Sequence, residues 1–164
     1  MDNLTMCHDS NEPLAGIKLP RGQAGVSILW PTEWNSKVKK LKVGNERVIA
    51  VTINSIPSLC IINAYLPTQA SNSQYAYEEC LDLIYDIIMK YENSYEIILC
   101  GDLNGTLLNH RNNKHDQLLK KFVKETGLKF NNHIGSQSTF FHHAQTSESQ
   151  IDYILTKNSS FLCK

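Results

Sequence analysis

Asp102 and Asn104 stand two residues apart and follow the short apolar run Ile97 to Cys100, from which Gly101 separates them. This run is rich in β-branched residues and predicts a strand that is buried on both faces. In open α/β sheets, ligands bind beyond the carboxyl ends of the strands. A carboxylate and a carboxamide at such an end can hold a metal-bound water and donate to a phosphoryl oxygen. By themselves, these residues are more typical of a turn in which Asp and Asn bond to nearby backbone, so the surrounding sequence has to decide.

The composition indicates one ordinary globular domain without a strong charge bias. The chain has 164 residues, of which 41% are hydrophobic and 20% charged, and its 16 basic residues equal its 16 acidic ones in number. A nucleic-acid enzyme of this composition has to gather its basic residues on one face. The densest basic run, Lys37 to Lys42, alternates with apolar residues, which favours a solvated edge strand or a loop.

The cysteines and the apolar runs indicate where such a protein works. The five cysteines form no C-x-x-C pair and no metal-finger spacing, and an odd number without pattern is typical of a reducing compartment. No apolar run is long enough to span a membrane, and Met1 to Leu4 carry no basic-then-apolar signal. We expect an intracellular protein, in the nucleus or the cytoplasm, with no membrane partner and no obligate oligomer.

The first half of the chain predicts a layered α/β architecture. Residues 1–23 are polar and aperiodic and predict a loop or tail. Three strands are then expected to be consecutive neighbours in one sheet: Ala24–Trp30, Arg47–Ile53 and Leu59–Leu66. A helix should follow, since Tyr77, Leu81, Ile84, Ile88 and Tyr91 recur at helical spacing. With the strand at Ile97, this makes a strand–helix–strand unit, which favours parallel pairing.

The second half continues the alternation of helix and strand. A helix is expected to start at His115 and Asp116, to bury Leu118, Leu119, Phe122 and Val123, and to end at Gly127 as a left-handed cap. Short strands are predicted at Leu128–Phe130, Ser138–His142 and Gln150–Leu155, with a loop from His143 to Ser149.

Several motifs in this order resemble the endonuclease/exonuclease/phosphatase superfamily, and most of all the endonuclease domains of LINE-type (non-LTR) retrotransposons. The motifs are RGQAGVSILW, CIINAYLPT, ILCGDLNGTL, the N-x-x-H-D run at Asn112–Asp116, STFFHH and SQIDYIL. The resemblance covers most of the chain, from about Arg21 to Leu155. It implies an α/β fold of the four-layer sandwich type, with two β-sheets flanked by helices, and metal-dependent cleavage of nucleic-acid phosphodiester bonds, most often DNA.

The resemblance also implies roles for four residues. Asp102 matches the catalytic Asp that positions or deprotonates the attacking water, and Asn104 matches the Asn that orients the phosphate or that water. Tyr65 matches the Tyr whose hydroxyl reaches the scissile phosphate, and Asp152 matches the Asp that orients a catalytic histidine. Asp102 and Asn104 are the expected ligands of Mg²⁺, or of Mn²⁺ in its place, in a site with few protein ligands.

The sequence also departs from the family pattern. The family's Gln-Glu strand, whose Glu binds Mg²⁺, has no match, and Glu12 lies in the wrong context to replace it. The Ser-Asp-His segment that carries the catalytic histidine has no match either, and His115, His142 and His143 are not assigned to catalysis. We therefore expect a polar segment over residues 1–22 and a single incomplete domain over residues 23–164, cut at both ends and inactive in cleavage as it stands.

Two other functions stay open at this point. One is a remnant without catalysis that binds nucleic acid or a protein partner through the same crevice. The other is a phosphatase for small or lipid phosphoesters, since the superfamily includes such enzymes. Whether the chain is an enzyme is left undecided by the sequence, because the metal-binding Glu and the catalytic His are not found in it.

Overall fold

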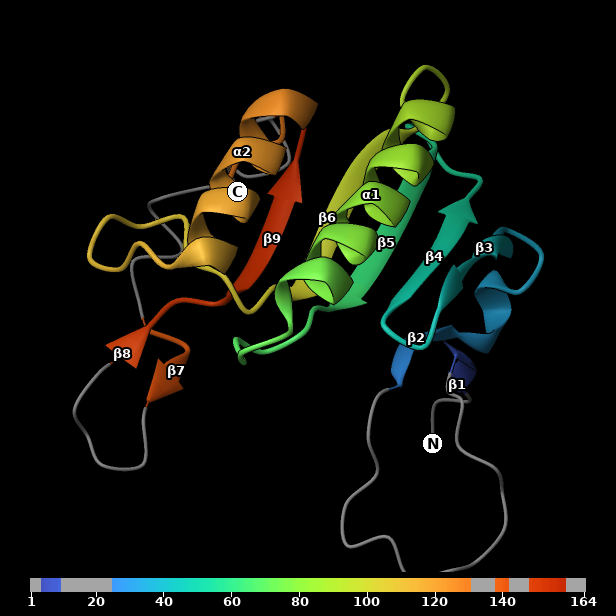
Figure 1. Ribbon diagram of the computed structural model, residues 1–164. Coiled ribbons are helices and arrows are strands. Elements are labelled where there is room, and N and C mark those ends of the chain that lie inside the picture. The colour runs from blue at the N-terminus through green and yellow to red at the C-terminus, as the bar shows by residue number, and fades with distance from the viewer. Residues whose placement is uncertain (1–3, 10–24, 131–137, 142–147, 159–164) are drawn as a thin grey trace, which may run out of the picture.

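A mixed sheet of five strands forms the centre of the protein (Figure 1). The structure is a computed structural model that describes residues 4–9, 25–130, 138–141 and 148–158. The strands of this sheet lie in the order β3-β4-β5-β6-β9. Their bounds are β3 Val38–Asn45, β4 Val48–Ile53, β5 Leu59–Tyr65, β6 Glu96–Asp102 and β9 Asp152–Thr156. β5 and β6 are parallel, as the strand–helix–strand pattern predicts, and the other neighbouring pairs are antiparallel.

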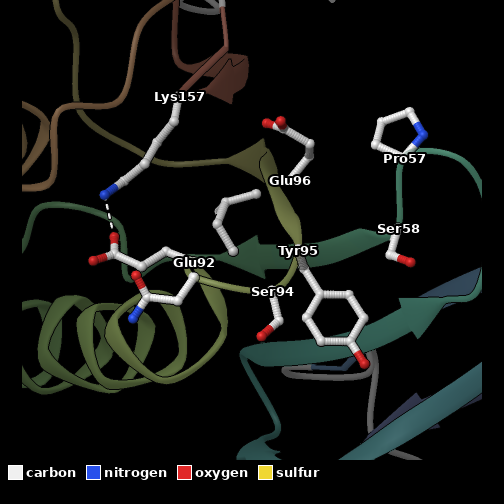
Figure 2. Close-up of a pocket in the computed structure, with 9 residues that line it drawn as sticks. Pro57, Ser58, Glu92, Ser94, Tyr95, Glu96 and Lys157 are labelled. Atoms are coloured by element: carbon white, nitrogen blue, oxygen red, sulfur yellow. Dashed lines mark hydrogen bonds and ion pairs between the residues drawn. The ribbon is translucent and has the colours of Figure 1, made fainter.

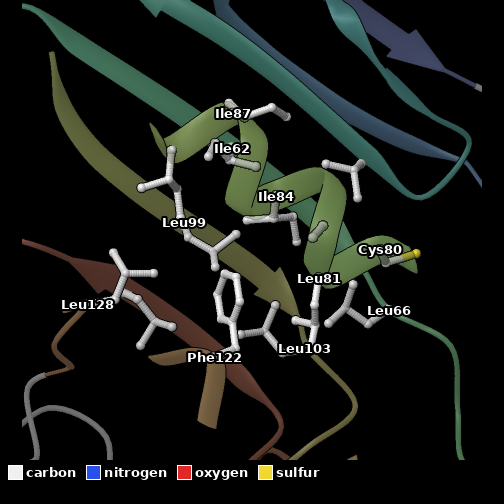
Figure 3. Packing of buried hydrophobic residues seen from close by; sticks show 14 of the residues in the cluster. Ile62, Leu66, Cys80, Leu81, Ile84, Ile87, Leu99, Leu103, Phe122 and Leu128 are labelled. Atoms are coloured by element: carbon white, nitrogen blue, oxygen red, sulfur yellow. The ribbon is translucent and has the colours of Figure 1, made fainter. Parts of the chain in front are cut away.

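Two helices cover one face of this sheet (Figures 1 and 3). α1 (Gln74–Tyr91) buries Tyr77, Leu81, Ile84 and Ile88, which are four of the five residues predicted for its apolar face. α2 (Lys114–Thr126) buries Leu119 and Phe122. Both helices share one apolar core with the inward residues of the strands, among them Ile62 and Leu99. Burial of this core supplies the main driving force for folding.

Capping residues fix both ends of α2. The side chain of Asn113 accepts a hydrogen bond from the backbone N–H of Asp116, and the Asp116 carboxylate accepts one from the N–H of Asn113 in return. This capping box satisfies two of the unpaired N–H groups of the first turn. Gly127 ends the helix with a φ of 69°, which confirms the predicted left-handed cap.

A smaller sheet lies against the other face of the central one. β1 (Leu4–Asp9) and β2 (Val26–Pro31) pair in antiparallel fashion, and the 3₁₀ helix η1 (Thr32–Trp34) follows. The Asn63 side chain of β5 donates a hydrogen bond to the Ser27 carbonyl of β2 over 2.9 Å, which joins the two sheets. A second two-stranded sheet, β7 (Phe140–Phe141) with β8 (Glu148–Ser149), lies beyond the start of β9 (Figure 1). Two sheets with a helix layer confirm the predicted α/β sandwich class.

Several sequence predictions need correction. Leu4–Asp9 forms a strand, so the loop expected over residues 1–23 is wrong for that stretch, while residues 10–23 lie outside the described chain. The Val26–Pro31 strand pairs with β1 and not with β4, because the two belong to different sheets. Ile97–Cys100 buries alternate residues and not both faces equally. Leu128–Phe130 makes a single bridge, Lys129 to Thr156, and no strand.

The C-terminal loop also differs in part. Glu148 and Ser149, expected in a loop, form β8, while 142–147 lie outside the described residues. Apart from Lys37, which precedes it, the basic run at Lys37 to Lys42 belongs to β3, which is an edge strand of the central sheet, as one of the two interpretations predicted. Within the described ranges, no helix combines the length and apolar character that a membrane crossing requires.

Candidate active site

Three of the four predicted site residues lie side by side at one end of three neighbouring strands of the central sheet. Tyr65 at the end of β5 pairs in register with Asp102 at the end of β6. Asp102 in turn pairs with Asp152 at the start of β9. Since neighbouring strands are about 4.8 Å apart, the three residues form a row across three adjacent strands.

The three side chains also belong to the same face of the sheet. Side chains alternate along a strand, so Tyr65 shares a face with Asn63, which contacts β2, while Ala64 belongs to the core under the helices. By the same alternation, Asp102 and Asp152 lie on the side away from Tyr153, which is buried in that core. Asp152 is exposed, Asp102 is half-buried, and 37% of Tyr65 is exposed. The row is therefore open to a ligand.

Asn104 is tied to the same edge through Leu66. Its backbone is left-handed, with a φ of 47°. Its Nδ2 donates to the Leu66 carbonyl over 2.8 Å, and its N–H donates to Asp102 Oδ1 over 3.0 Å. The Leu66 N–H donates to the Asp102 carbonyl over 2.9 Å, which closes the link between the ends of β5 and β6. These bonds fix the Asn104 carboxamide so that its oxygen is the end turned away from Leu66.

Gly101 allows β5 and β6 to approach each other just before the site. Its φ is 125°, in the region that favours glycine, and a Cβ at this position would come within 2.0 Å of the Ala64 carbonyl oxygen. A side chain here would push the two strands apart. Gly101 therefore keeps Asp102 in register with Tyr65.

The loop after Asp102 is held from three sides. The Tyr77 hydroxyl of α1 donates to the Leu103 carbonyl over 2.8 Å, and the Leu107 N–H donates to the Tyr153 hydroxyl over 3.0 Å. The Thr106 N–H donates to Asp116 Oδ1 over 2.8 Å. Because these partners come from α1, α2 and β9, the loop conformation depends on the whole core.

Asp116 is a structural residue of this loop. It is fully buried, forms an ion pair with Arg111 at 2.8 Å, and Arg111 also donates to the Ser149 hydroxyl over 3.2 Å. Burial alone raises the pKa of Asp116, but the hydrogen bonds from Arg111, Thr106 and Asn113 outweigh it, so the pKa is lowered. Asp116 therefore stays ionised and paired.

The pKa of Asp102 is shifted in the opposite direction to that of Asp116. Burial raises the pKa of the Asp102 carboxyl, the negative charge of Asp152 raises it further, and hydrogen bonds from Asn104 lower it in part. Two carboxylates in adjacent positions repel each other, and a bound cation or proton relieves that repulsion. This arrangement suits a site that handles a cation or a proton.

Sequence reasoning missed Arg47 near these residues, and it included Thr139 only within the STFFHH motif, without a role of its own. Arg47 lies beside Tyr65, because it precedes β4 and β4 runs antiparallel to β5. The Nη1 of Arg47 donates a hydrogen bond to the Tyr65 carbonyl over 3.3 Å, and the Arg47 guanidinium lies 5.7 Å from the centre of the Tyr65 ring. The Thr139 hydroxyl accepts hydrogen bonds from the N–H groups of Ile151 and Asp152 and so holds the start of β9. Only the pairing of β4 with β5 could have pointed to Arg47.

Among the residues that the structure describes, none of the histidines considered in the sequence analysis joins the row of Tyr65, Asp102 and Asp152. His115 is buried in α2, stacks on the Tyr77 ring at 4.0 Å and lies 3.1 Å from the Ser73 hydroxyl, which agrees with its assignment as a helix-start residue. Burial lowers the pKa of His115. His142 and His143 lie outside the described residues, as does Glu12. In the described ranges, no three His, Cys, Asp or Glu side chains gather closely enough to hold a metal by themselves.

A cavity of about 270 Å³ lies at the opposite end of β6 (Figure 2). Ser58, Tyr95 and Glu96 line it, together with the ion pair of Lys157 with Glu92. Glu96 begins the strand that Asp102 ends, so this cavity and the row of site residues are separated by the length of β6. The cavity is therefore not part of the candidate active site.

Solved structures of nucleases share this fold. The endonuclease domain of TRAS1, a telomere-specific non-LTR retrotransposon, superposes with a TM-score of 0.72 at 14% identity, over 96% of this chain and 68% of that one. The 3′ phosphatase NExo from Neisseria, bound to a product DNA hairpin, gives 0.65 at 16% identity, over 95% and 67%. An AP endonuclease from Archaeoglobus fulgidus gives 0.60 at 17% identity, over 94% and 66%. The chain thus spans about two thirds of the length of each.

The sequence itself matches a known family. No curated protein matches the chain. The family described as endonuclease-reverse transcriptase, however, matches residues 59–163, which is well over half of the chain and includes all four predicted site residues. The chain therefore belongs to the endonuclease–reverse transcriptase family, within the endonuclease/exonuclease/phosphatase superfamily.

Proposed function

We propose that this chain carries part of a metal-dependent endonuclease site of retrotransposon origin, which acts on phosphodiester bonds of nucleic acid, with DNA as the first candidate. The observation that supports this best is the row of Tyr65, Asp102 and Asp152 in register over three neighbouring strands. The nucleic-acid substrate is supported by relatives of the same fold whose structures contain a DNA hairpin product or a single-strand DNA product.

Each residue of the row has a role in this proposal. Asp102 positions or deprotonates the attacking water, and Asn104 orients the phosphate or that water, since its carboxamide is fixed by Leu66. The Tyr65 hydroxyl donates to a phosphate oxygen as negative charge grows there. Asp152 orients a histidine that is not among the residues of the row. Arg47 holds the Tyr65 backbone and adds a positive charge next to the phosphate position.

The donor set fits a Mg²⁺ or Mn²⁺ ion in part. Burial, and after it the negative charge of Asp152, raises the pKa of Asp102, and a bound cation would relieve the repulsion between the two carboxylates. The oxygens of Asp102 and Asn104, the expected ligands, are of the hard type that Mg²⁺ prefers. With so few protein ligands, water and substrate phosphate have to complete the coordination. When bound, the ion would neutralise charge that develops on the phosphate.

We further propose that the chain as given cleaves DNA negligibly. Its sequence matches neither the Gln-Glu segment nor the Ser-Asp-His segment of the family, and groups that act together fail together when one is lost.

The experiment compares two proteins in a plasmid-nicking assay with Mg²⁺. One is the chain as given, and the other is extended with the Gln-Glu and Ser-Asp-His segments of a complete family member. We expect nicking only by the extended protein, abolished by Asp102→Ala and unchanged by Asp86→Ala, whose residue is exposed on α1. An extended, folded protein that does not nick would favour a binding remnant. Cleavage of small phosphoesters alone would favour a phosphatase.

A further inference from the structure

A groove runs between α1 and α2 on the outer side of the helix layer, where the two helices lie side by side (Figure 1). Leu81 of α1 and Phe122 of α2 form its floor, and Tyr85 and Leu118 stand at its sides. Tyr85 is 40% exposed and Leu118 is half-buried, so apolar surface remains open to solvent.

The size of the groove favours the side chains of a partner over a small ligand. Its volume is about 250 Å³. Pockets that enclose small molecules usually measure about 300–1,000 Å³ and bury most of the ligand. A groove between two helices can instead accept anchor side chains of a peptide helix laid along it.

The charges at the groove have one predominant sign. Glu78 and Asp82 of α1 and Glu125 of α2 line it, against one cation, Lys121, which lies 3.8 Å from Glu125. The groove therefore carries three negative charges and one positive, while the whole chain has a formal net charge of 0. This local excess is complementary to a basic partner.

The acidic side of the groove continues along α1. Glu78, Asp82 and Asp86 follow each other at intervals of four residues, and in α1 the first basic residue is Lys90. Like charges at this spacing destabilise a helix. Cations of a partner placed along this side would reduce the repulsion among Glu78, Asp82 and Asp86. This series of acidic residues is therefore a further reason to expect a basic partner.

We propose that the groove between α1 and α2 binds a basic amphipathic helix of a protein partner. Its apolar residues would contact Tyr85 and Leu118, and its Lys or Arg residues would pair with Glu78, Asp82 and Glu125. The groove lies on the helix side of the central sheet, whereas Tyr65, Asp102 and Asp152 face the other side. A partner in the groove thus leaves the row of site residues accessible.

The test measures the binding of a fluorescent amphipathic peptide of about 15 residues, the length at which isolated helices become stable. The peptide carries Leu at spacings of three and four and Lys elsewhere, and its control has the same composition with the Leu residues dispersed. We expect Asp82→Lys to weaken binding about tenfold and to reduce its salt dependence. Tyr85→Ser should weaken binding without changing the salt dependence. Glu79→Lys makes the same charge change on the same helix outside the groove and should stay within about twofold of the unmodified protein.

Any of the following outcomes would overturn the proposal. Equal effects of Glu79→Lys and Asp82→Lys would mean general attraction to an acidic helix, and equal binding of the dispersed peptide would mean that no groove is involved. Weaker binding to Asp152→Asn with no change for Asp82→Lys would place the peptide at the edge of the sheet. No binding at low salt to a protein whose circular dichroism shows it folded would also refute the groove as a docking site.

Discussion

The carboxyl group of Asp102 has a raised pKa because it is partly buried and lies opposite Asp152. A raised pKa in the folded state means that folding favours the protonated form. The stabilisation from this group is therefore complete below the pKa of the unfolded chain and is lost as the pH rises through the higher folded-state value. At neutral pH, ionised Asp102 thus costs the fold free energy, as expected at a functional site.

We predict that Asp102→Asn raises the melting temperature at pH about 7 by a few degrees, because Asn avoids this cost. The difference between the two proteins should shrink as the pH falls through the raised folded-state pKa of Asp102, because the carboxyl group then takes up its proton. Melting curves over this pH range provide the measurement. The control is Asp86→Asn on the exposed side of α1. A variant less stable than the unmodified protein at neutral pH would show that Asp102 has a supporting role in the fold.

The residue scale is also where the sequence was most informative. Tyr65, Asp102 and Asp152 could be proposed because the motifs that contain them resemble the family's motifs, and the structure brings the three residues together, although their chemistry stays a prediction. Arg47 could not be proposed, because nothing in its own neighbourhood distinguishes it from other surface arginines. Its place depends on the antiparallel pairing of β4 with β5, which is a long-range property.

At the scale of elements, α2 depends on one buried ion pair. Asp116 closes the capping box, pairs with Arg111 and accepts from Thr106 in the loop after Asp102. Its lowered pKa means that its stabilisation is present above the pKa of the unfolded chain and is lost as the pH falls through the folded-state value. Asp116 thus connects the start of α2 to the site loop.

Asp116→Asn should lower the free energy of unfolding at neutral pH by about 3 kcal/mol, because it leaves Arg111 and two N–H groups without their charged partner. The matched control on the same helix is Glu125→Gln, which breaks the exposed pair with Lys121 and should cost less than about 1 kcal/mol. Urea unfolding of both variants provides the comparison. Equal losses would mean that burial does not distinguish the two pairs.

Helices were easier to predict than strand pairing, for a physical reason. The apolar residues of α1 and α2 repeat within a few residues, so their period is visible locally. β1 has no such signal, since its strand character comes from pairing with β2, beyond residues 10–24. β3 was ambiguous because its lysines alternate with apolar residues, and β9 gives no local sign that it lies beside β6.

At the scale of the whole molecule, the described structure exposes much apolar surface. Leu4 and Met6 on β1 are 59% and 56% exposed, Leu29 opposite Met6 on β2 is 53% exposed, and Ile154 on β9 is 64% exposed. Clustered apolar residues of this kind are typical of interaction sites or of aggregation-prone surfaces. Among the described residues, β3 and β9 are also the outer strands of the central sheet, where further pairing can occur, although Lys129 already bridges to Thr156 at the end of β9.

We predict a broad thermal transition and strong binding of a dye that reports exposed apolar surface. Replacing Met6 and Leu29 together with Thr should lower dye binding and light scattering without lowering the melting temperature, because both side chains are exposed. Ile62→Thr, at a fully buried position, should instead unfold the protein. A sharp cooperative melt with weak dye binding in the unmodified protein would contradict this prediction.

The row of Tyr65, Asp102 and Asp152 is assembled from three distant stretches of the chain. The three residues therefore come together only when the strands that carry them are correctly paired. A cut between Phe130 and Ser138 would put Asp102 and Asp152 on separate polypeptides, neither of which has the pair. Recombining the two pieces has to restore the β6–β9 register before the two carboxylates can influence each other. The shifted titration of Asp102 would then serve as a built-in reporter of reassembly, and the protein could be developed into a split sensor without an added label.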